Sequence, residues 1–319
     1  MDAPPVITDL GDGRERRVVP VTTLASGHAL AITTLVLHGD KPGPTVGVSA
    51  TIHGDEFEGV MILRDLWRTM QRRDLAGTLC LLPVANPPAL GALSRNTPVD
   101  QLDLNRNFPG TPDGWLSEQL AATISREFLA GLDYYVDLHA GGTFPWVDYC
   151  YVLNDEAFSR AFLSRLLYQP AQLYQGTAAG VTAGRGTPTC VVEIGGGYQD
   201  QAVHTQNGVR GVRNMLRHAG ALPGPATARP GQVLLRTMKV MRPRQGGLLI
   251  PEGPLPPGTE LDGPATLAEI VSPYTFEPLE TMVTPFQRNI VVLSRNYVSR
   301  VQPGDYAFMI GDGATATAY

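Results

Sequence analysis

A histidine and a glutamate stand three residues apart just after an apolar segment of the chain. The segment Pro44–Ala50 reads PTVGVSA, and His53 and Glu56 follow it. An imidazole nitrogen and a carboxylate oxygen in this arrangement can bind one face of a metal ion, and zinc prefers such ligands. The pair therefore predicts a metal site, although a loop histidine beside an acid at a helix start would give the same pattern.

A third ligand is offered by His139, which ends the run YYVDLH and precedes three small residues. Asp137 lies two residues earlier, on the same side of a strand, and is a candidate hydrogen-bond partner for an imidazole. A catalytic zinc site uses three protein ligands and keeps one position open. We therefore expect His53, Glu56 and His139 to hold one zinc ion; the alternative for His139 is a histidine that merely ends a strand.

Two arginines and an asparagine offer groups for binding a substrate. The segment DLNRNFP contains Asn105 and Arg106, and a guanidinium beside a carboxamide suits a substrate carboxylate. Arg95 lies ten residues before Asn105, and a cation near a metal can stabilise the oxyanion formed when water adds to a carbonyl. Structural or exposed arginines would be the simpler interpretation of either one alone.

A second glutamate ends another apolar run. Glu193 stands in TCVVEIGGG, where a carboxylate is unfavourable unless it has a partner or a chemical task. Partial burial raises the pKa of a carboxyl group towards the working range of a general base. Glu193 is therefore our candidate general base, with a buried acid paired to an arginine as the alternative.

Alternating strands and helices position these residues. Apolar runs predict buried strands at 44–52, 78–86, 134–138 and 189–194. Helical spacing of apolar residues predicts helices at 58–73, 117–129, 156–167 and 206–218. The pattern indicates an α/β domain whose mixed, mostly parallel sheet is flanked by helices. Such sheets bind ligands at the carboxyl ends of their strands, where three of the four features lie.

Composition changes after about residue 222. The segment 222–231 reads LPGPATARPG and has the character of a linker. The chain beyond it is rich in Pro, Gly, Val and Thr and lacks helical periodicity, which favours short strands. We therefore predict a catalytic domain at 1–225 and a small all-β domain at 226–319.

Bulk properties exclude several classes of protein. The 319 residues carry a formal net charge of −5, which argues against non-specific nucleic-acid binding. No segment approaches 18 consecutive apolar residues, and the N-terminus lacks the apolar region of a signal peptide, so we expect neither a membrane span nor a leader. Cys80, Cys150 and Cys190 have no CxxC spacing and are expected to be free thiols in a reducing compartment, the cytoplasm.

Taken together, His53-x-x-Glu56, Asn105-Arg106, His139 and Glu193 occur in the order typical of zinc carboxypeptidase-like enzymes. The motifs HGDEFEG, DLNRNFPG, DLHAGG and GTPTCVVEIGG resemble the succinylglutamate desuccinylase/aspartoacylase family. The organisation is most similar to its N-acetyl-diaminobutyrate deacetylase-like members. This resemblance covers about residues 40–220. In the C-terminal part, GGLLIPEGPLPPGTEL and SRVQPGDYAFMIGD resemble the paired half-motifs of a barrel-sandwich fold.

The resemblance implies a role for each candidate residue. The three expected ligands would hold zinc, and Arg95 would polarise the scissile carbonyl. Asn105 and Arg106 would bind the substrate carboxylate. Glu193 would first activate water as a base and then protonate the leaving amine. The β-rich C-terminal domain would border the mouth of the site and narrow access to it.

These expectations describe a cytoplasmic, zinc-dependent amidohydrolase that removes an acetyl- or succinyl-type group from a small N-acyl amino acid. A metallocarboxypeptidase acting on peptides would use the same residues and is the first alternative. A non-catalytic binding protein on the same scaffold is the second. Neither nucleic acid nor membrane is expected as a partner, and assembly into a homo-oligomer stays open.

Overall fold

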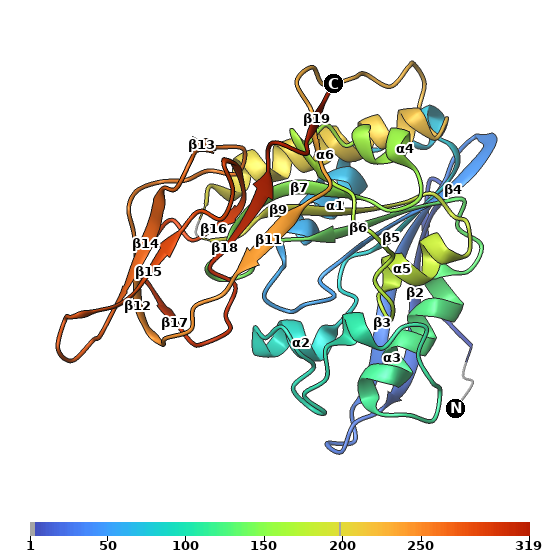
Figure 1. Ribbon diagram of the computed structural model, residues 1–319. Coiled ribbons are helices and arrows are strands. Elements are labelled where there is room, and N and C mark those ends of the chain that lie inside the picture. The colour runs from blue at the N-terminus through green and yellow to red at the C-terminus, as the bar shows by residue number, and fades with distance from the viewer. Residues whose placement is uncertain (1–3, 198) are drawn as a thin grey trace.

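The computed structural model describes residues 4–197 and 199–319. A large mixed sheet runs through the molecule, and a smaller antiparallel sheet formed by strands of the C-terminal region lies at one side of it (Figure 1). The strands at the centre of the large sheet are parallel to one another: β5 (Ala76–Leu82), β4 (Lys41–Ala50), β6 (Tyr134–His139) and β9 (Thr189–Gly195). This mixed α/β architecture, flanked by helices, confirms the prediction from the sequence.

Antiparallel strands extend the parallel centre on both sides. On the side of β5 they are β3 (Ala29–His38), β2 (Arg14–Thr23) and β1 (Val6–Gly11). On the side of β9 they begin with β7 (Trp146–Val152) and continue into β16 (Arg288–Ser294), β18 (Phe308–Asp312) and β11 (Met238–Met241). Four short strands pair beside this path: β8 (Leu166–Tyr168), β10 (Val233–Leu235), β13 (Glu260–Asp262) and β19 (Thr317–Ala318).

The C-terminal region is rich in strands, as predicted. Its separate sheet contains β15 (Pro278–Val283), β14 (Thr266–Val271), β12 (Gly247–Pro251) and β17 (Ser299–Val301). Apolar side chains of this sheet pack with those of β16 and β18 in one core cluster. Because β16 and β18 also belong to the large sheet, the division at residue 225 stays a prediction.

Helices pack on both faces of the large sheet. They are α1 (Glu58–Thr69), α2 (Pro87–Ala92), α3 (Leu116–Ile124), α4 (Glu156–Arg160), α5 (Ala178–Gly184) and α6 (Gln201–His218). One core cluster joins α1, α4 and α6 to the sheet, and a second joins α3 and α5 to it. Among the described residues, no helix is long and apolar enough to cross a membrane.

The alternation of side chains along β6 decides which face carries the functional residues. Val136 and Leu138 pack into the core under α1 and α6, whereas Tyr135 packs into the core beside α3 and α5. Successive side chains of a strand point to opposite faces. Asp137 and His139 therefore lie on the face of Tyr135, away from α1 and α6.

One predicted helix is correct only in its first part. The segment 156–167 was expected to be helical, but α4 ends at Arg160 and Leu163 adopts a φ of 74°. Such a left-handed conformation interrupts a right-handed helix. Leu166 and Leu167 instead form β8, which pairs in parallel with both β7 and β10. Burial in the sheet therefore outweighs the helical spacing of these leucines.

Candidate functional site

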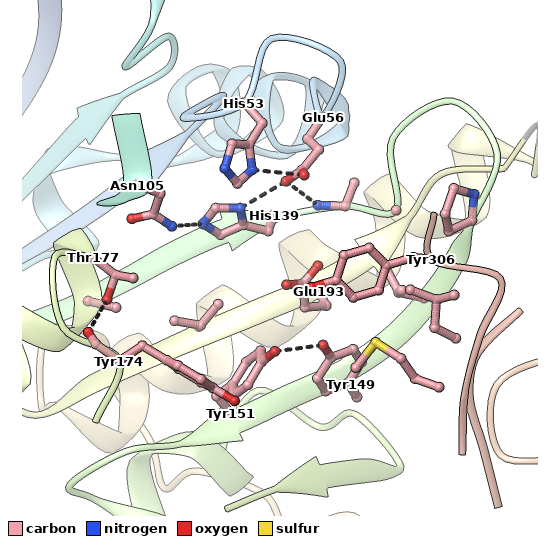
Figure 2. Close-up of a pocket in the computed structure, with 18 of the residues that line it drawn as sticks. His53, Glu56, Asn105, His139, Tyr149, Tyr151, Tyr174, Thr177, Glu193 and Tyr306 are labelled. Carbon is pink, nitrogen blue, oxygen red and sulfur yellow. Dashed lines mark hydrogen bonds and ion pairs between the residues drawn. The ribbon is translucent and has the colours of Figure 1, made fainter. Parts of the chain in front are cut away.

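A pocket of about 250 Å³ opens at the carboxyl ends of β6 and β9, and Figure 2 shows part of its lining. Loops that follow β4 and β5 form one wall, and strands from β7 to β11 form the other. The pocket brings together every site residue predicted from the sequence: His53, Glu56, Arg95, Asn105, Arg106, His139 and Glu193. Open sheets of this kind place their ligands at such an edge.

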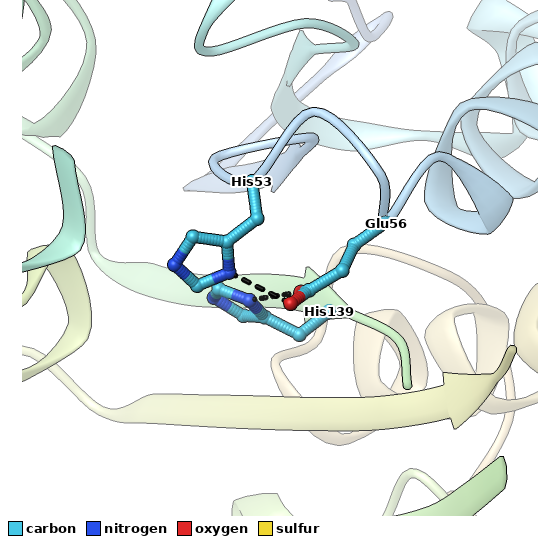
Figure 3. Close-up of side chains that lie close together, drawn as sticks. All are labelled: His53, Glu56 and His139. Atoms are coloured by element: carbon cyan, nitrogen blue, oxygen red, sulfur yellow. Dashed lines mark hydrogen bonds and ion pairs between the residues drawn. The ribbon is translucent and has the colours of Figure 1, made fainter. Parts of the chain in front are cut away.

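His53, Glu56 and His139 face one another with the donor atoms of a metal site (Figure 3). The two carboxylate oxygens of Glu56 each lie 2.8 Å from the Nδ1 atom of one histidine. One ligand atom from each residue lies within 4.8 Å of the others, and all three side chains are buried. Two imidazoles and a carboxylate are a donor set that suits zinc, so this group could hold a metal ion.

Each imidazole meets a second carboxylate through its other nitrogen. Asp103 lies 3.1 Å from Nε2 of His53, and Asp137 lies 3.3 Å from Nε2 of His139. Such partners orient a metal-binding histidine and fix which nitrogen carries the proton. With Nε2 hydrogen-bonded to the aspartate, Nδ1 is the ring atom that faces Glu56 and would bind a cation.

The charge balance of the group favours an added cation. Burial opposes a positive charge on His53, but Glu56 and Asp103 outweigh it and raise the pKa of this imidazole. Burial likewise opposes the charge on His139, and Asp137 with Glu56 raises its pKa well above the ordinary value. The carboxylates around both imidazoles thus favour positive charge at this place, which protonated imidazoles or a bound metal ion could supply.

Arg95 borders this group at the mouth of the pocket. Its guanidinium lies 3.3 Å from Glu56 and 3.0 Å from Asp103, with 46% of the side chain exposed. Burial disfavours its charge, but Glu56 and Asp103 raise the pKa of the guanidinium above its usual value. Arg95 is therefore a fixed positive charge beside the place for a metal. We call His53, Glu56, His139, Arg95 and Asp103 the charged cluster.

Asn105 and Arg106 lie in a 3₁₀ turn, Leu104–Arg106, beside the charged cluster. The side-chain oxygen Oδ1 of Asn105 accepts a hydrogen bond of 3.0 Å from the backbone N–H of Ala178. The Nδ2 atom of the same side chain lies 3.4 Å from Nε2 of His139. Arg106 is exposed and donates one hydrogen bond of 2.7 Å to the backbone oxygen of Asn105. Asn105 is thus built into the wall, whereas Arg106 extends a charge into the pocket.

Glu193 continues the row of functional side chains across the sheet. It is the register partner of His139 on β6 and of Tyr149 on β7, so the three side chains share one face. Burial raises the pKa of Glu193 to about 8, against the opposing influence of His139. A carboxyl group with such a pKa can take and return a proton near neutral pH.

The sequence motifs did not reveal several residues of the site. Asp103 stands in the quoted DLNRNFP segment, but its contact with His53 joins positions 50 residues apart and has no local signal. Four tyrosines line the pocket although the sequence motifs assign none of them to the site: Tyr149, Tyr151, Tyr174 and Tyr306. Tyr306 belongs to the C-terminal region, which confirms that this region borders the mouth of the pocket.

The chain was compared with known families and curated proteins. The model of the succinylglutamate desuccinylase/aspartoacylase catalytic domain matches residues 42–219. The N-alpha-acetyl-L-2,4-diaminobutyric acid deacetylase of Halomonas elongata is 30% identical over 214 residues, which are 63% of this chain and 61% of that protein. The match therefore spans less than two thirds of the relative's length.

Solved structures are similar over nearly the whole chain. A succinylglutamate desuccinylase from Silicibacter sp. TM1040 has a TM-score of 0.84 and 26% identity, covering 98% of this chain and 99% of its own. The product-bound ectoine utilization protein EutE (DoeB) from Ruegeria pomeroyi has a TM-score of 0.84 and 26% identity, and the match covers 97% of this chain and 98% of that protein. The similarity thus includes the C-terminal strands that the family model leaves unmatched.

Proposed function

Because this chain belongs to the succinylglutamate desuccinylase/aspartoacylase family, we propose that it hydrolyses the amide bond of small N-acyl amino acids. The expected acyl groups are of the acetyl or succinyl type, in line with the names of its relatives. The observation that carries the proposal is the buried group of His53, Glu56 and His139 beside Glu193. A family likeness alone would leave the chemistry unassigned, because one fold hosts many functions.

We propose that His53, Glu56 and His139 hold one zinc ion per chain. Their buried nitrogen and oxygen donors and the carboxylates behind both imidazoles support this assignment. Zinc supplies Lewis-acid chemistry when bound, since it polarises a carbonyl group and makes water more acidic. The protein's part is to hold the ligands in place, and Asp103 and Asp137 do this by fixing the two rings.

Glu193 is the proposed proton carrier. It takes a proton from the attacking water and later gives that proton to the nitrogen of the leaving amine. Its position next to His139 and its pKa of about 8 support both halves of this role. In the free pocket burial keeps the carboxyl group protonated at neutral pH, and a nearby cation would favour the carboxylate form that accepts a proton.

Arg95 and Arg106 are assigned to two different groups of the substrate, the acyl carbonyl and the carboxylate. Arg95 lies at the charged cluster, where a fixed guanidinium can stabilise the negative charge that develops on the carbonyl oxygen. Arg106 extends into the pocket and can bind the substrate carboxylate through two parallel hydrogen bonds. Asn105 is proposed to bind the carboxylate together with Arg106, which donates to its backbone oxygen, and its side chain also contacts His139.

A small substrate is favoured over a peptide. The pocket of about 250 Å³ is narrowed by side chains of the C-terminal region, including Met238 and Tyr306. Pockets for drug-sized ligands commonly measure about 300–1,000 Å³. A peptide would need a longer groove, so we place deacylation of an amino acid ahead of the carboxypeptidase alternative.

The experiment that tests the proposal combines metal analysis with a substrate panel. Zinc is measured in protein purified without added metal, and the zinc-loaded enzyme is assayed on N-acetyl, N-succinyl and N-formyl amino acids and on C-terminal dipeptides. We expect near-stoichiometric zinc and hydrolysis of the N-acyl amino acids only. Hydrolysis confined to dipeptides would support a carboxypeptidase, and protein without zinc or activity would support a binding protein.

Location and assembly stay predictions. The three cysteines are free thiols, with Cys150 and Cys190 buried, which is compatible with the proposed reducing cytoplasm. A homo-oligomer would be recognised by its mass in solution, and fractionation of cells would test the location.

A further inference from the structure

Beyond the charged cluster, the floor of the pocket continues as a row of apolar side chains across four strands. Val147 on β7 is the register partner of Leu293 on β16, Leu293 that of Met309 on β18, and Met309 that of Val240 on β11. Register partners of adjacent strands point to the same face of a sheet. All four residues line the pocket, and we call them the apolar row.

The apolar row is continuous with the proposed chemistry. Val147 and Tyr149 stand two positions apart on β7 and therefore share a face. Tyr149 is the register partner of Glu193, and Glu193 that of His139. One face of one sheet thus leads from the metal ligands through Glu193 to the apolar row. For a substrate bound at the metal ligands, the apolar row is the adjacent surface of the pocket on the side of β11.

The tyrosines between the two regions present rings rather than charges. The Tyr149 hydroxyl donates to that of Tyr151 at 3.0 Å, a bond drawn as a dashed line in Figure 2. The centroids of the two rings are 5.2 Å apart. Burial raises the pKa of both phenols well above the usual value, so they stay neutral. Tyr306 lies at the rim, and its ring is 4.1 Å from the guanidinium carbon of Arg242. A substrate therefore meets aromatic surface on its way to the apolar row.

Charge is distributed unevenly around the pocket. Arg95 and Arg106 reach it from loops that follow β5, whereas its lining residues from β11, β16 and β18 carry no charge. A charged group placed over the apolar row would lose hydration without gaining a partner. An aliphatic or aromatic group placed there would be removed from water at no such cost.

We propose that the apolar row binds an apolar group of the substrate, so that the enzyme selects N-acyl amino acids carrying an aliphatic or aromatic group over those with a second charge. This inference rests on the proposed function, whose substrate class it narrows. The apolar group can come from the acyl chain or from the amino-acid side chain, and the two sources present the same chemistry to the row.

Binding is measured by calorimetry on the zinc-loaded Glu193→Gln variant, so that turnover does not enter. The ligands are N-acetylglycine, N-acetylleucine, N-hexanoylglycine and N-acetylglutamate. We expect N-acetylleucine or N-hexanoylglycine to bind at least about tenfold more tightly than N-acetylglycine, since a single methylene in an apolar pocket changes affinity by about tenfold or more. Tighter binding of N-acetylleucine would place the apolar group in the amino-acid side chain, and tighter binding of N-hexanoylglycine would place it in the acyl chain. N-acetylglutamate should bind no more tightly than N-acetylglycine.

Two changes at Val240 connect the gain to the apolar row. Adding Val240→Asp to the Glu193→Gln protein should abolish the tenfold gain, and the milder Val240→Ala should reduce it. Val283→Asp is the matched control, because Val283 is 40% exposed on β15 and lies outside the pocket. Thermal unfolding checks that each variant folds. Equal affinity for all four ligands, or a gain that survives both changes at Val240, would overturn the inference.

Turnover by the unmodified enzyme distinguishes a failure of this inference from a failure of the proposed function on which it rests. If zinc-loaded protein hydrolyses N-acetylglycine but the two apolar ligands bind no better, the deacylase stands and the inference is wrong. If nothing is hydrolysed but the gain appears and disappears with Val240→Asp, the apolar row is a binding site and the proposed deacylase is wrong.

Discussion

The two sides of the pocket are built by different means. The charged cluster consists of loop and strand-end residues joined by hydrogen bonds and ion pairs, some between near neighbours in the chain and some between positions 50 or 83 residues apart. The apolar row consists of strand residues aligned by sheet register, and its side chains pack in one apolar core cluster. In our proposals the first side holds the groups that react, and the second is the surface that selects the substrate.

The two sides also differ in how much change they should tolerate. Removing one partner from a buried set of charges leaves another charge unpaired, and this typically destabilises by about 3–5 kcal/mol. Apolar side chains can be exchanged for others of similar volume with losses below about 1.5 kcal/mol. Substitutions in the charged cluster should therefore weaken or abolish activity, whereas substitutions in the apolar row should alter the choice of substrate.

The largest expected effect is the loss of the metal from the charged cluster. In the double variant His53→Ala/His139→Ala, one ligand of three remains, so zinc should be absent and hydrolysis undetectable. Metal content after dialysis, measured by atomic absorption, checks the first point. Val240→Ala is the control from the apolar row and should keep wild-type zinc. Full occupancy in the double variant would show that the metal binds elsewhere.

Replacing the proton carrier should separate chemistry from metal binding. Glu193→Gln keeps the shape of the side chain but cannot accept the proton, so turnover should fall by about 10²–10⁴-fold at unchanged zinc content. Steady-state kinetics on an N-acetyl amino acid measures the loss. Turnover close to that of the wild type would remove Glu193 from the mechanism and assign its raised pKa to burial alone.

A smaller effect should follow from the residue behind His53. Asp103→Asn keeps an oxygen near the ring but removes a charge, and such changes typically weaken metal affinity by about 10–100-fold. Competition with a zinc chelator measures the affinity. Asp113→Asn in the same loop region is the control, because Asp113 is exposed. Equal affinity in the two variants would mean that Asp103 serves Arg95 rather than the metal.

The smallest effect concerns the far face of β7, where His204 packs against Trp146 with ring centroids 6.2 Å apart. Burial lowers the pKa of this imidazole below 6.5, although Asp148 opposes the shift. The unfolded chain then binds the proton more readily, so stability is present above pH 6.5 and is lost as the pH falls below it.

Urea unfolding between pH 7.5 and 5.5 in saturating zinc measures this dependence. The contribution of His204 should stay below about 1.4 kcal/mol per pH unit, the limit for one proton, and His204→Asn should remove it. The preference between apolar and charged substrates should not change in this variant. A changed preference would mean that the two faces of β7 are coupled and that the apolar row does not act alone.

The charged cluster and Glu193 were largely predictable because their motifs are local. His53 and Glu56 are separated by two residues, and His139 and Glu193 each follow an apolar run that could only be a buried strand. Parallel strands bring such positions to one edge of the sheet. Asp103 was not assigned because its contact with His53 depends on how an intervening loop folds back.

The apolar row could not be predicted in the same way. Val147 and Leu293 are ordinary strand residues, and nothing in the sequence indicates that β16 pairs with β7 across more than a hundred intervening residues. The helix predicted at 156–167 is partly wrong for a related reason, because the leucines of β8 have helical spacing but are buried between two strands. In both places long-range pairing outweighs a local pattern.

The sequence by itself determined the ligand types, the order of the motifs and the alternation of strands and helices, because these depend on neighbours along the chain. Only the tertiary structure decided that Glu193 lies beside His139 and that the face carrying both continues onto β11. The physical reason is that sheet register is fixed by the burial of whole faces, to which each residue contributes little. The motifs therefore contain the proposed reactive groups, and only the fold creates the surface that we propose selects the substrate.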